Sequence, residues 1–297
     1  MPELPEVETV ANGVHQRVHG RRIASVWTSG KPQTFKSPES EIVDTLTGAR
    51  IAQVRRVGKT IVMTVERDLD RSHALRKPKP PESPTTAEFL IHLGMTGRLL
   101  VSAADVPLPP HTHAVLKLDE GREIRFVDPR RFGRLSILHS DSLPPTNNEE
   151  RRADNYTGPG REPLTISLED FIALFRGRKT SIKAALLNQS LLHGVGNIYA
   201  DESLFRAGIR PRRQAGRLTR AELTRLRRAL VEVLRHAIKL GGSSVSDYVD
   251  ADGVRGFFQL RHKVYQRTGE PCLVCATPIK KITIAGRSTH FCPNCQK

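Results

Sequence analysis

Four cysteines near the end of the 297-residue chain place the strongest constraint on its fold. They stand as Cys272-x2-Cys275 and Cys292-x2-Cys295, with 16 residues between the two pairs. Two close pairs of thiolates at this spacing are typical of a tetrahedral structural zinc site with no open coordination position. Two disulfides are the alternative, but nothing in the sequence places the chain in an oxidising compartment. We therefore expect one structural Zn²⁺ per chain.

The residues between the cysteine pairs predict a hairpin. The short runs 282–284 and 289–291 are rich in strand-forming residues, and Ala285-Gly286-Arg287 between them suits a turn. A zinc ion held by four cysteines would stiffen this hairpin. We therefore expect Arg287 to be the functional group at this end of the chain, and the metal to have a structural role only.

The charge balance favours a polyanionic partner. The chain has 47 Lys plus Arg against 31 Asp plus Glu, a formal net charge of +16, which makes nucleic acid the leading candidate. An anionic membrane surface is the alternative, but the basic segment 218–240 lacks aromatic anchors. The chain has no apolar run long enough to cross a bilayer and no signal-peptide pattern, so we expect a soluble, cytoplasmic protein.

The first half of the chain predicts one helix followed by short strands. Residues 5–18 carry valines and an alanine at helical spacing, which indicates an amphipathic helix. The many short strands that follow this helix, separated by turns, suggest a β-sandwich or barrel. The predicted strands are 23–27, 49–56, 60–66, 88–93, 98–102, 114–118, 123–127 and 134–138. The polar, Pro-rich segment 68–86 interrupts this pattern and is expected to be a mobile surface loop.

The second half of the chain predicts helices. Residues 141–165 are rich in Pro, Gly, Asn and charge, which marks an interdomain linker. Ser167 opens a capping box before one helix, 181–187 forms a second, and 218–240 forms a long basic helix that ends at two glycines. The segment 243–259 contains further glycines and is expected to be a flexible loop that closes over a ligand.

The segment 193–200, HGVGNIYA, predicts a glycine-rich turn that leads into a helix capped by Asn197. Backbone N–H groups presented together at such a turn can hold a phosphate. A helical hairpin used only for packing is the alternative, and the upstream Arg178, Lys179 and Lys183 favour DNA.

Three strand connections carry side chains suited to chemistry on a duplex. Residues 57–59 form a tight turn that places Lys59 at a sheet rim, while 94–97 (GMTG) and 128–133 (DPRRFG) present Met95 and Phe132 on loops. Apolar side chains among cations can unstack a duplex and fill the gap left by an extruded base. The alternatives are a solvated Lys59, and Met95 and Phe132 packed back onto the sandwich.

The first nine residues, MPELPEVET, combine a nucleophile with an acid. Removal of Met1 would give Pro2 a secondary amine, which can condense with an aldehyde carbon to an iminium. A neighbouring carboxylate favours the charged amine, so a neutral Pro2 requires a protonated Glu3 or opposing cations such as Lys59. The alternative is a stiff tail whose glutamates complement the positive end of a helix.

Five segments occur here in one order: 2–9, 92–97, 128–133, 194–200 and the four-cysteine ribbon. Together they closely resemble the bacterial formamidopyrimidine-DNA glycosylases, which excise 8-oxoguanine and ring-opened purines. The resemblance spans nearly the whole chain and implies an α+β fold with DNA in the cleft between two lobes. Its implied parts are a β-sandwich with an amino-terminal helix at 1–140, a linker at 141–166, a helix-two-turn-helix domain with a base-covering loop at 167–263, and a zinc ribbon at 264–297.

The resemblance also implies roles for individual residues. Pro2 would attack C1′ of the damaged nucleoside, and Glu3 would give and take protons beside it. Lys59 would donate a proton in β-elimination, and Arg287 would assist the second, δ elimination. The implied DNA contacts are His92, His111, Arg130, Arg178, Lys183, Asn197 and Tyr265, with Met95, Arg130 and Phe132 filling the void in the duplex.

Two segments depart from the pattern of the family. Residues 253–256 read GVRG where a GKPG-like turn is common, so contacts of this loop to the base are not carried over. The insertion 68–86 is longer than the usual hairpin, and its lysines are candidates for contacts with flanking DNA.

Two rival functions are set against this interpretation. An endonuclease VIII-type glycosylase shares the amino-terminal chemistry but prefers oxidised pyrimidines, and Leu4, Met95 and Phe132 argue against it. A non-catalytic zinc-ribbon DNA-binding protein would leave the Pro-Glu terminus unexplained. We therefore expect a monomeric glycosylase and AP lyase that acts on damaged double-stranded DNA in the bacterial cytoplasm, associated with the nucleoid and not with a membrane.

Overall fold

The computed structural model describes residues 1–67, 85–139, 156–244 and 249–297, which form two compact units. The first unit contains Met1–Pro2, Val7–Thr157 and Asp247–Arg255. The second contains Glu3–Glu6, Gly158–Ser246 and Gly256–Lys297. The change of unit after Thr157 lies within the segment where the linker was predicted. Most of the predicted insertion 68–86 and of the linker lies outside the described residues.

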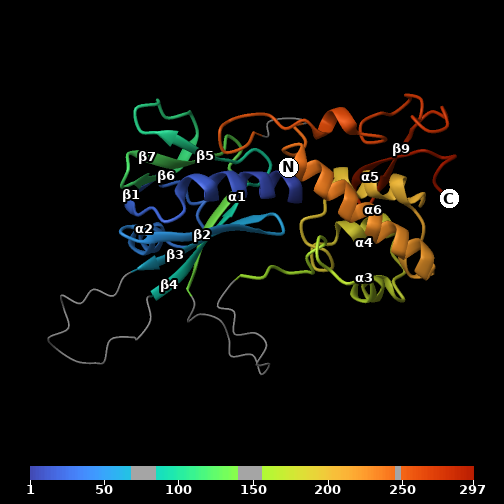
Figure 1. The fold of residues 1–297 in the computed structure, drawn as a ribbon, viewed down its shortest axis with the longest axis horizontal. Coiled ribbons are helices and arrows are strands. Elements are labelled where there is room, and N and C mark those ends of the chain that lie inside the picture. Colours follow the sequence, from blue (N-terminus) through green and yellow to red (C-terminus); the bar gives the residue numbers. More distant parts are fainter. Residues whose placement is uncertain (68–84, 140–155, 245–248) are drawn as a thin grey trace, which may run out of the picture. The chain divides into compact units, whose positions relative to one another are not determined.

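Within the described residues, the first unit contains eight antiparallel strands in two four-stranded sheets (Figure 1). One sheet has the order β1-β6-β7-β5 and the other the order β2-β3-β4-β8. All eight predicted strands are confirmed, with ends that differ by at most three residues. The strands are β1 (Ile23–Thr28), β2 (Arg50–Val57), β3 (Thr60–Arg67), β4 (Thr85–His92), β5 (Arg98–Ala103), β6 (Thr112–Leu118), β7 (Arg122–Val127) and β8 (Arg134–His139).

The two sheets of the first unit share one apolar core. Phe89 and Ile91 of β4 are buried in the same cluster as Phe126 of β7. Val10 and Val14 of helix α1 (Leu4–Val18) are buried there too, as the helical spacing predicted. Because inward-facing side chains of both sheets meet in one core, the unit is a β-sandwich with an amino-terminal helix.

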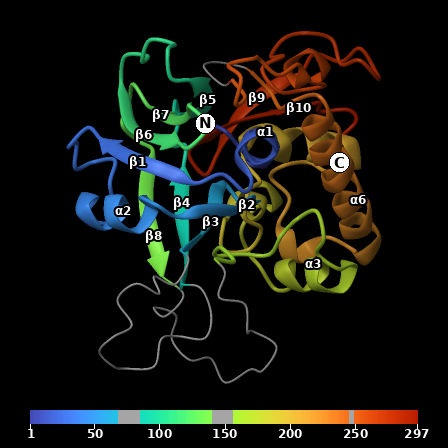
Figure 2. The ribbon, with the colours of Figure 1, turned by 60° about the vertical axis from the view of Figure 1, so that its left-hand side comes forward.

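Helix α2 (Glu39–Leu46) lies beside β1 and β8 and was not predicted (Figure 2). Its Ile42 and Leu46 are one helical turn apart and fully buried. The helix has only eight residues, and Pro38 at its start makes no side-chain capping hydrogen bond. A pattern this short gives little periodicity to detect.

The second unit packs helices around its own core and carries the cysteine ribbon. The predicted capping of α3 by Ser167 is confirmed, since its hydroxyl accepts the Asp170 N–H. Thr219 and Glu222 form a capping box at the start of the long basic helix. The elements are α3 (Leu168–Phe175), α4 (Ile182–Leu187), α5 (Asn197–Ala207), η4 (Ala215–Arg217), α6 (Arg220–Lys239), η5 (Phe258–Arg261), β9 (Lys280–Ile284) and β10 (Arg287–Phe291).

The hairpin β9–β10 confirms the turn predicted between the cysteine pairs. Ala285 and Gly286 both have positive φ, 48° and 70°, as a two-residue turn between antiparallel strands requires. Arg287 is therefore the first residue of β10 and is exposed. Among the helices in the described ranges, none is long and apolar enough to cross a membrane.

Candidate active site and nucleic-acid interface

The Glu3 carboxylate lies at the amino-terminal end of α5. It accepts the Ile198 N–H at 3.1 Å and the Tyr199 N–H at 3.5 Å, and the side chain is almost fully buried. Free N–H groups and the helix dipole at this end stabilise a negative charge. Glu3 therefore fills the position of a helix cap, although it is far away in the sequence.

This arrangement corrects one prediction about the segment 193–200. Gly196 and not Asn197 is the N-cap of α5, and Asn197 is the first helical residue. The Ile198 and Tyr199 N–H groups donate to Glu3, a partner that the sequence did not suggest. The turn 194–198 is thus a cradle for a carboxylate of the same chain. The helix N–H groups gain an acceptor there, and the buried acid gains hydrogen-bond donors.

The two glycines of the cradle permit close approach of the amino-terminal residues. Gly194 has φ of 90°, and a Cβ there would lie 2.9 Å from the Leu4 side chain. A Cβ on Gly196 would lie 2.2 Å from the Glu3 carboxyl carbon. The Leu4 N–H also donates to the Gly194 carbonyl at 3.0 Å. Any larger residue at Gly196 must displace the Glu3 carboxylate.

We predict that Gly196→Ala reduces the strand cleavage implied by the resemblance by about 10- to 100-fold, because the methyl group displaces a carboxylate to which the resemblance assigns proton transfer. Single-turnover cleavage rates measure the effect. Gly13→Ala in α1 is the matched control, since its Cβ would meet the Ala251 Cβ at 3.2 Å and no site residue. A wild-type rate for Gly196→Ala would contradict the importance of the Glu3 position.

Glu6 connects the start of α1 to the glycine pair after α6. Its buried carboxylate accepts the Glu3 N–H at 2.8 Å, the Ser243 N–H at 2.7 Å and the Tyr199 hydroxyl. Burial raises the pKa of Glu6. Gly242 has φ of 79°, and a Cβ there would lie 2.9 Å from the Glu6 side chain. Sequence reasoning assigned Glu6 only to the helix dipole and missed this connection.

His262 provides a pH-dependent contact beside Glu6's partner Ser243. Its Nε2 lies 3.2 Å from the Ser243 hydroxyl, and its ring packs edge-on against Phe258 and Tyr265. Burial lowers the pKa of His262 from 6.5 to about 4. The folded chain therefore holds a neutral ring at pH values where the unfolded chain binds a proton.

We predict that stability contributed by neutral His262 is present above pH 6.5 and is lost as the pH falls toward 4. At about 1.4 kcal/mol per pKa unit, the loss is on the order of 2 to 3 kcal/mol. Denaturant titrations from pH 7 to pH 4 should show a smaller decrease for His262→Gln than for the wild type. Equal decreases in the two proteins would contradict a depressed pKa at this ring.

Strand register in the first unit places three polar residues side by side at one rim of the β2-β3-β4-β8 sheet. Thr60 of β3 pairs with His92 of β4, and His92 pairs with Arg134 of β8. Lys59 immediately precedes Thr60 and is half-buried in the predicted turn. The sheet therefore gathers Lys59, His92 and Arg134 from three separate parts of the sequence.

The surroundings of His92 at this rim favour its neutral form. Burial, with added repulsion from Arg134 and Lys59, lowers the pKa of His92 below 6.5. Its Nδ1 accepts the Gly94 N–H at 3.1 Å, which leaves Nε2 as the N–H donor. The ring can therefore offer one hydrogen bond to a ligand without carrying charge.

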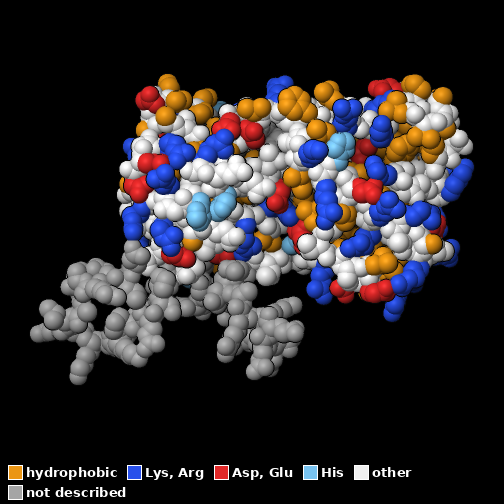
Figure 3. Space-filling model, in the orientation of Figure 1, with side chains coloured by type: hydrophobic (Ala, Val, Ile, Leu, Met, Phe, Trp, Pro, Cys, Tyr) orange, Lys and Arg blue, Asp and Glu red, His pale blue; other side chains and the backbone are white. Residues whose placement is uncertain are grey.

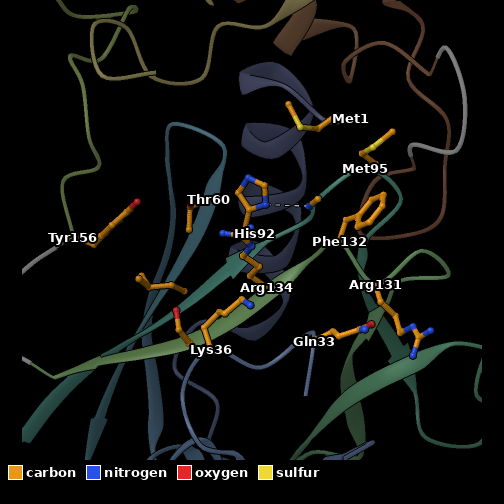
Figure 4. Close-up of a pocket in the computed structure, with 13 residues that line it drawn as sticks. Met1, Gln33, Lys36, Thr60, His92, Met95, Arg131, Phe132, Arg134 and Tyr156 are labelled. Atoms are coloured by element: carbon orange, nitrogen blue, oxygen red, sulfur yellow. Dashed lines mark hydrogen bonds between the residues drawn. The ribbon is translucent and has the colours of Figure 1, made fainter. Parts of the chain in front are cut away.

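A cavity of about 700 Å³ opens at this rim within the first unit. Met1, Thr60, His92, Met95, Phe132 and Arg134 are among its lining residues, and Figure 4 shows Met95 and Phe132 near one another beside His92. This volume is within the usual range for sites that enclose a small organic group. The amino terminus of the chain thus reaches the cavity that carries the polar rim.

Met95 and Phe132 are presented to solvent by two loops that are clamped together. Their side chains are 40% and 51% exposed, so the alternative of packing onto the sandwich is wrong. The Arg130 guanidinium lies 5.0 Å from the centre of the Phe132 ring. A Cβ on Gly94 would lie 2.5 Å from the Phe132 backbone, which shows how closely the loops approach.

Asp128 is the clamp between these loops. Its fully buried carboxylate accepts the Thr96 hydroxyl at 2.6 Å, the Gly133 N–H at 2.7 Å and the Arg130 N–H at 3.2 Å. It thereby fixes the segments that carry Met95 and Phe132. Sequence reasoning quoted Asp128 within its motif without a role, although an Asp before a Pro is a common sign of side-chain-to-backbone bonding in a turn.

Lys183 forms buried contacts that the sequence did not predict. The resemblance implied a DNA contact, but its side chain is fully buried and its Nζ lies 2.6 Å from Asp201 of α5. The same Nζ donates to the Ser288 carbonyl of β10 at 2.8 Å, and Asp201 accepts the His290 N–H at 2.8 Å. Lys183 therefore holds β10, which begins with Arg287, because a buried ammonium requires a paired acid.

Of the remaining predicted residues, Pro2 is buried and the others are exposed or half-exposed. Asn197 donates to the Ser288 hydroxyl at 3.4 Å, and burial raises the pKa of the adjoining Tyr265. The first unit holds Pro2, Lys59, His92, Met95, His111, Arg130 and Phe132, and the second holds Glu3, Arg178, Lys183, Asn197, Tyr265 and Arg287. Of these, Met95, His111, Arg130, Phe132, Arg178 and Arg287 are exposed.

The four cysteines of the second unit lie close enough to share one metal ion. Their sulfur atoms all lie within 4.8 Å of one another, with Cys272 and Cys295 at 3.9 Å and Cys275 and Cys292 at 3.4 Å. Four ligands about 2.3 Å from a tetrahedral zinc are separated by similar distances. None of the four cysteines forms a disulfide. The donor set and spacing therefore fit zinc.

Family models match three consecutive parts of the chain. Residues 1–135 match the formamidopyrimidine-DNA glycosylase N-terminal domain, and 159–249 match the H2TH domain of the same enzymes. Residues 269–297 match a zinc finger found in these glycosylases and in IleRS. The chain belongs to the formamidopyrimidine-DNA glycosylase family. Its four cysteines are accordingly the ligands of a structural zinc.

Relatives and solved structures of the formamidopyrimidine-DNA glycosylase family cover the whole chain. Formamidopyrimidine-DNA glycosylases from Solibacter usitatus and Herpetosiphon aurantiacus are 44% and 40% identical, each over all of both chains. A Lactococcus lactis family member in complex with Fapy-dG-containing DNA is 31% identical with a TM-score of 0.82, and both chains are covered completely. The Thermus thermophilus MutM structure is 38% identical with a TM-score of 0.78, covering 99% of this chain and 98% of that one. This chain is therefore a DNA repair glycosylase with an α+β fold of sandwich, H2TH and zinc-finger parts.

Proposed function

We propose that this chain is a bifunctional glycosylase and AP lyase that excises oxidised purines, including 8-oxoguanine and formamidopyrimidines, from duplex DNA. One observation carries the proposal: the amino terminus lines the cavity that contains His92, Met95 and Phe132. Removal of Met1 would replace that residue by the Pro2 amine. Lys and Arg side chains spread over the visible face of each unit supply attraction for the phosphates (Figure 3).

The first chemical step is attack by the neutral Pro2 nitrogen on C1′ of an extruded nucleotide. The bond from C1′ to the base breaks, and the base leaves with the bonding electrons and takes up a proton from solvent. The ionised Glu3 accepts the proton that the attacking Pro2 nitrogen releases and gives it to O4′ as the C1′–O4′ bond opens, which leaves a cationic iminium between Pro2 and C1′. The damaged base is then free, and the protein is covalently attached to the sugar.

The iminium supports two eliminations. It acidifies the C2′ hydrogen, which Glu3, now a carboxylate, accepts while the 3′ phosphate leaves with a proton from Lys59. A second elimination releases the 5′ phosphate, with the Arg287 guanidinium assisting its departure. Hydrolysis of the iminium returns the free Pro2 amine, so the atoms and protons balance over the cycle.

The cradle around Glu3 supports a neutral nucleophile. A bare carboxylate beside Pro2 would favour the charged amine. The Ile198 and Tyr199 N–H groups and the positive end of α5 oppose that effect by partly compensating the Glu3 charge. A neutral Pro2 is therefore better explained by an ionised Glu3 with a partly compensated charge than by a Glu3 that stays protonated.

Cleavage assays on matched duplexes test the proposal. We expect cleavage at 8-oxoguanine opposite cytosine with phosphate at both ends of the gap, and none at the same position in undamaged duplex. Exclusive cleavage at an oxidised pyrimidine would favour the endonuclease VIII-type alternative. A protein that binds the duplex without releasing any base would be the non-catalytic alternative.

The oligomeric state and the cellular location of the protein are inferred together with the proposed function. We infer a monomer in the cytoplasm, associated with the nucleoid, because the proposed substrate is chromosomal DNA and the net charge is +16. Sedimentation of the protein alone and with one equivalent of duplex distinguishes a monomer from a dimer.

A further inference from the structure

The second unit contains a cavity that the proposed chemistry does not use. Its volume is about 490 Å³, and it lies among α5, α6 and η5. The buried side chains of Phe205, Val233 and Phe258 form apolar parts of its lining. Phe205 stands eight residues after Asn197 on α5, or about 12 Å along a helix axis. The cavity is of a size that encloses a large apolar side chain.

Three cations surround this apolar lining. Arg206, Arg261 and Lys263 contribute to the cavity, and all three are exposed. Arg206 pairs with Glu232 at 2.7 Å. Within the described part of the chain, Arg261 and Lys263 form no ion pair. Two cations without acidic partners at the edge of an apolar cavity attract carboxylates.

The one acid in the lining does not oppose such a ligand. The Glu202 carboxylate accepts the N–H groups of Lys263, Val264 and Tyr265 at 2.9 to 3.0 Å. Its side chain is almost fully buried, and burial raises its pKa. The Glu202 oxygens are therefore occupied by backbone N–H groups, and these hydrogen bonds fix the segment that carries Lys263.

We propose that this cavity docks an acidic peptide segment that inserts one large apolar side chain against Phe205, Val233 and Phe258. The carboxylates of the peptide pair with Arg261 and Lys263 at the rim. A peptide fits better than DNA because the cations are clustered at one enclosed apolar cavity, whereas a duplex is bound by a basic stripe that follows its backbone. The site would let an acidic partner protein hold the enzyme while its DNA-binding residues stay available.

Fluorescence anisotropy with the full-length protein tests this proposal. The probe is Asp-Asp-Asp-Asp-Phe labelled with fluorescein at its amino end, and we expect saturable binding. The double variant Arg261→Glu, Lys263→Glu should weaken binding by at least about tenfold, because both exposed cations become acids. The probe Asp-Asp-Asp-Asp-Ala should bind at least about fivefold more weakly, because it lacks the apolar anchor.

A matched variant separates this site from general attraction to a basic protein. Arg225→Glu reverses an exposed charge on α6 outside the cavity lining, and it should leave probe binding within about twofold of the wild type. Equal weakening by Arg225→Glu and by the double variant would overturn the proposal. Displacement of the probe by undamaged duplex at stoichiometric concentration would instead assign these cations to nucleic acid. Absence of saturable probe binding would also overturn it.

Discussion

Pro2→Gly is expected to lower strand cleavage at 8-oxoguanine by about 100-fold while leaving duplex affinity within about threefold. Glycine still permits removal of Met1, but it replaces a constrained secondary amine by a more mobile primary one. The reaction would lose the proposed, oriented nucleophile, whereas the cations that attract DNA are unchanged. Single-turnover cleavage and fluorescence titration at fixed salt measure the two quantities separately.

Pro5→Ala is the matched control for Pro2→Gly. Pro5 lies in the first turn of α1, three residues from Pro2, and its nitrogen is an amide in the processed chain. We expect cleavage by Pro5→Ala within about threefold of the wild type, since alanine is well tolerated in a helix. If Pro2→Gly lost affinity and cleavage in the same proportion, Pro2 would be a binding residue and the nucleophile would have to lie elsewhere.

Loss of the zinc site is expected to have the second large effect. In Cys292→Ser, zinc content should fall well below one ion per chain and cleavage should fall by at least about 100-fold. The ribbon has only a small apolar cluster, in which its Val264 and Ile279 and Phe205 of α5 pack with the cysteines. A segment with so few apolar contacts requires the metal to fold. Without it, β10 cannot hold Arg287 in place.

Val274→Ala is the control for the ribbon. Val274 lies between Cys272 and Cys275 and is 74% exposed, so its truncation changes the turn between these two cysteines without removing a sulfur. Elemental analysis should find one zinc per chain, and hydrogen exchange of β9 and β10 should stay at the wild-type level. Full cleavage by Cys292→Ser without bound zinc would show that the ribbon folds unaided, which would contradict a structural role for the metal.

The sequence alone predicted the strands and most helices because local patterns determine them. Short runs of strand-forming residues at turn spacing marked all eight strands of the sandwich. Ser167 and Thr219 stand at helix starts, where their side chains accept N–H groups. The β2–β3 turn at Gly58 and the β9–β10 turn at Gly286 use positive φ, for which glycine is the ordinary choice. Each of these features is decided within a few residues of the chain.

The contacts that sequence reasoning missed concern partners that are distant in the sequence. Asn197 suits a cap by type, but Glu3 from the other end of the chain takes that position. Lys183 follows two basic residues and so suggested a DNA contact, whereas Asp201 and Ser288 enclose it. Tertiary contacts overrode local preference in both cases, because a buried charge must be matched wherever its partner lies.

The sequence predicted which residues form the candidate site, but not the residues that hold them in place. Met95 and Phe132 were expected on loops and are exposed there. Asp128, Glu6 and Glu202 were not singled out, although each accepts several hydrogen bonds that fix a neighbouring loop. Such acids are recognised from geometry, since a carboxylate that organises a loop and one exposed to solvent look alike in a sequence.

Trapping with sodium borohydride is the most direct test of the central claim, that the Pro2 amine forms a covalent bond with the damaged sugar. The protein, confirmed by mass to lack Met1, is mixed with duplex containing 8-oxoguanine opposite cytosine while the reductant is present. We predict a stable protein–DNA adduct, with peptide mass analysis locating the sugar remnant on Pro2, and no adduct with undamaged duplex. Base release without any adduct, or an adduct located on Lys59, would contradict the account.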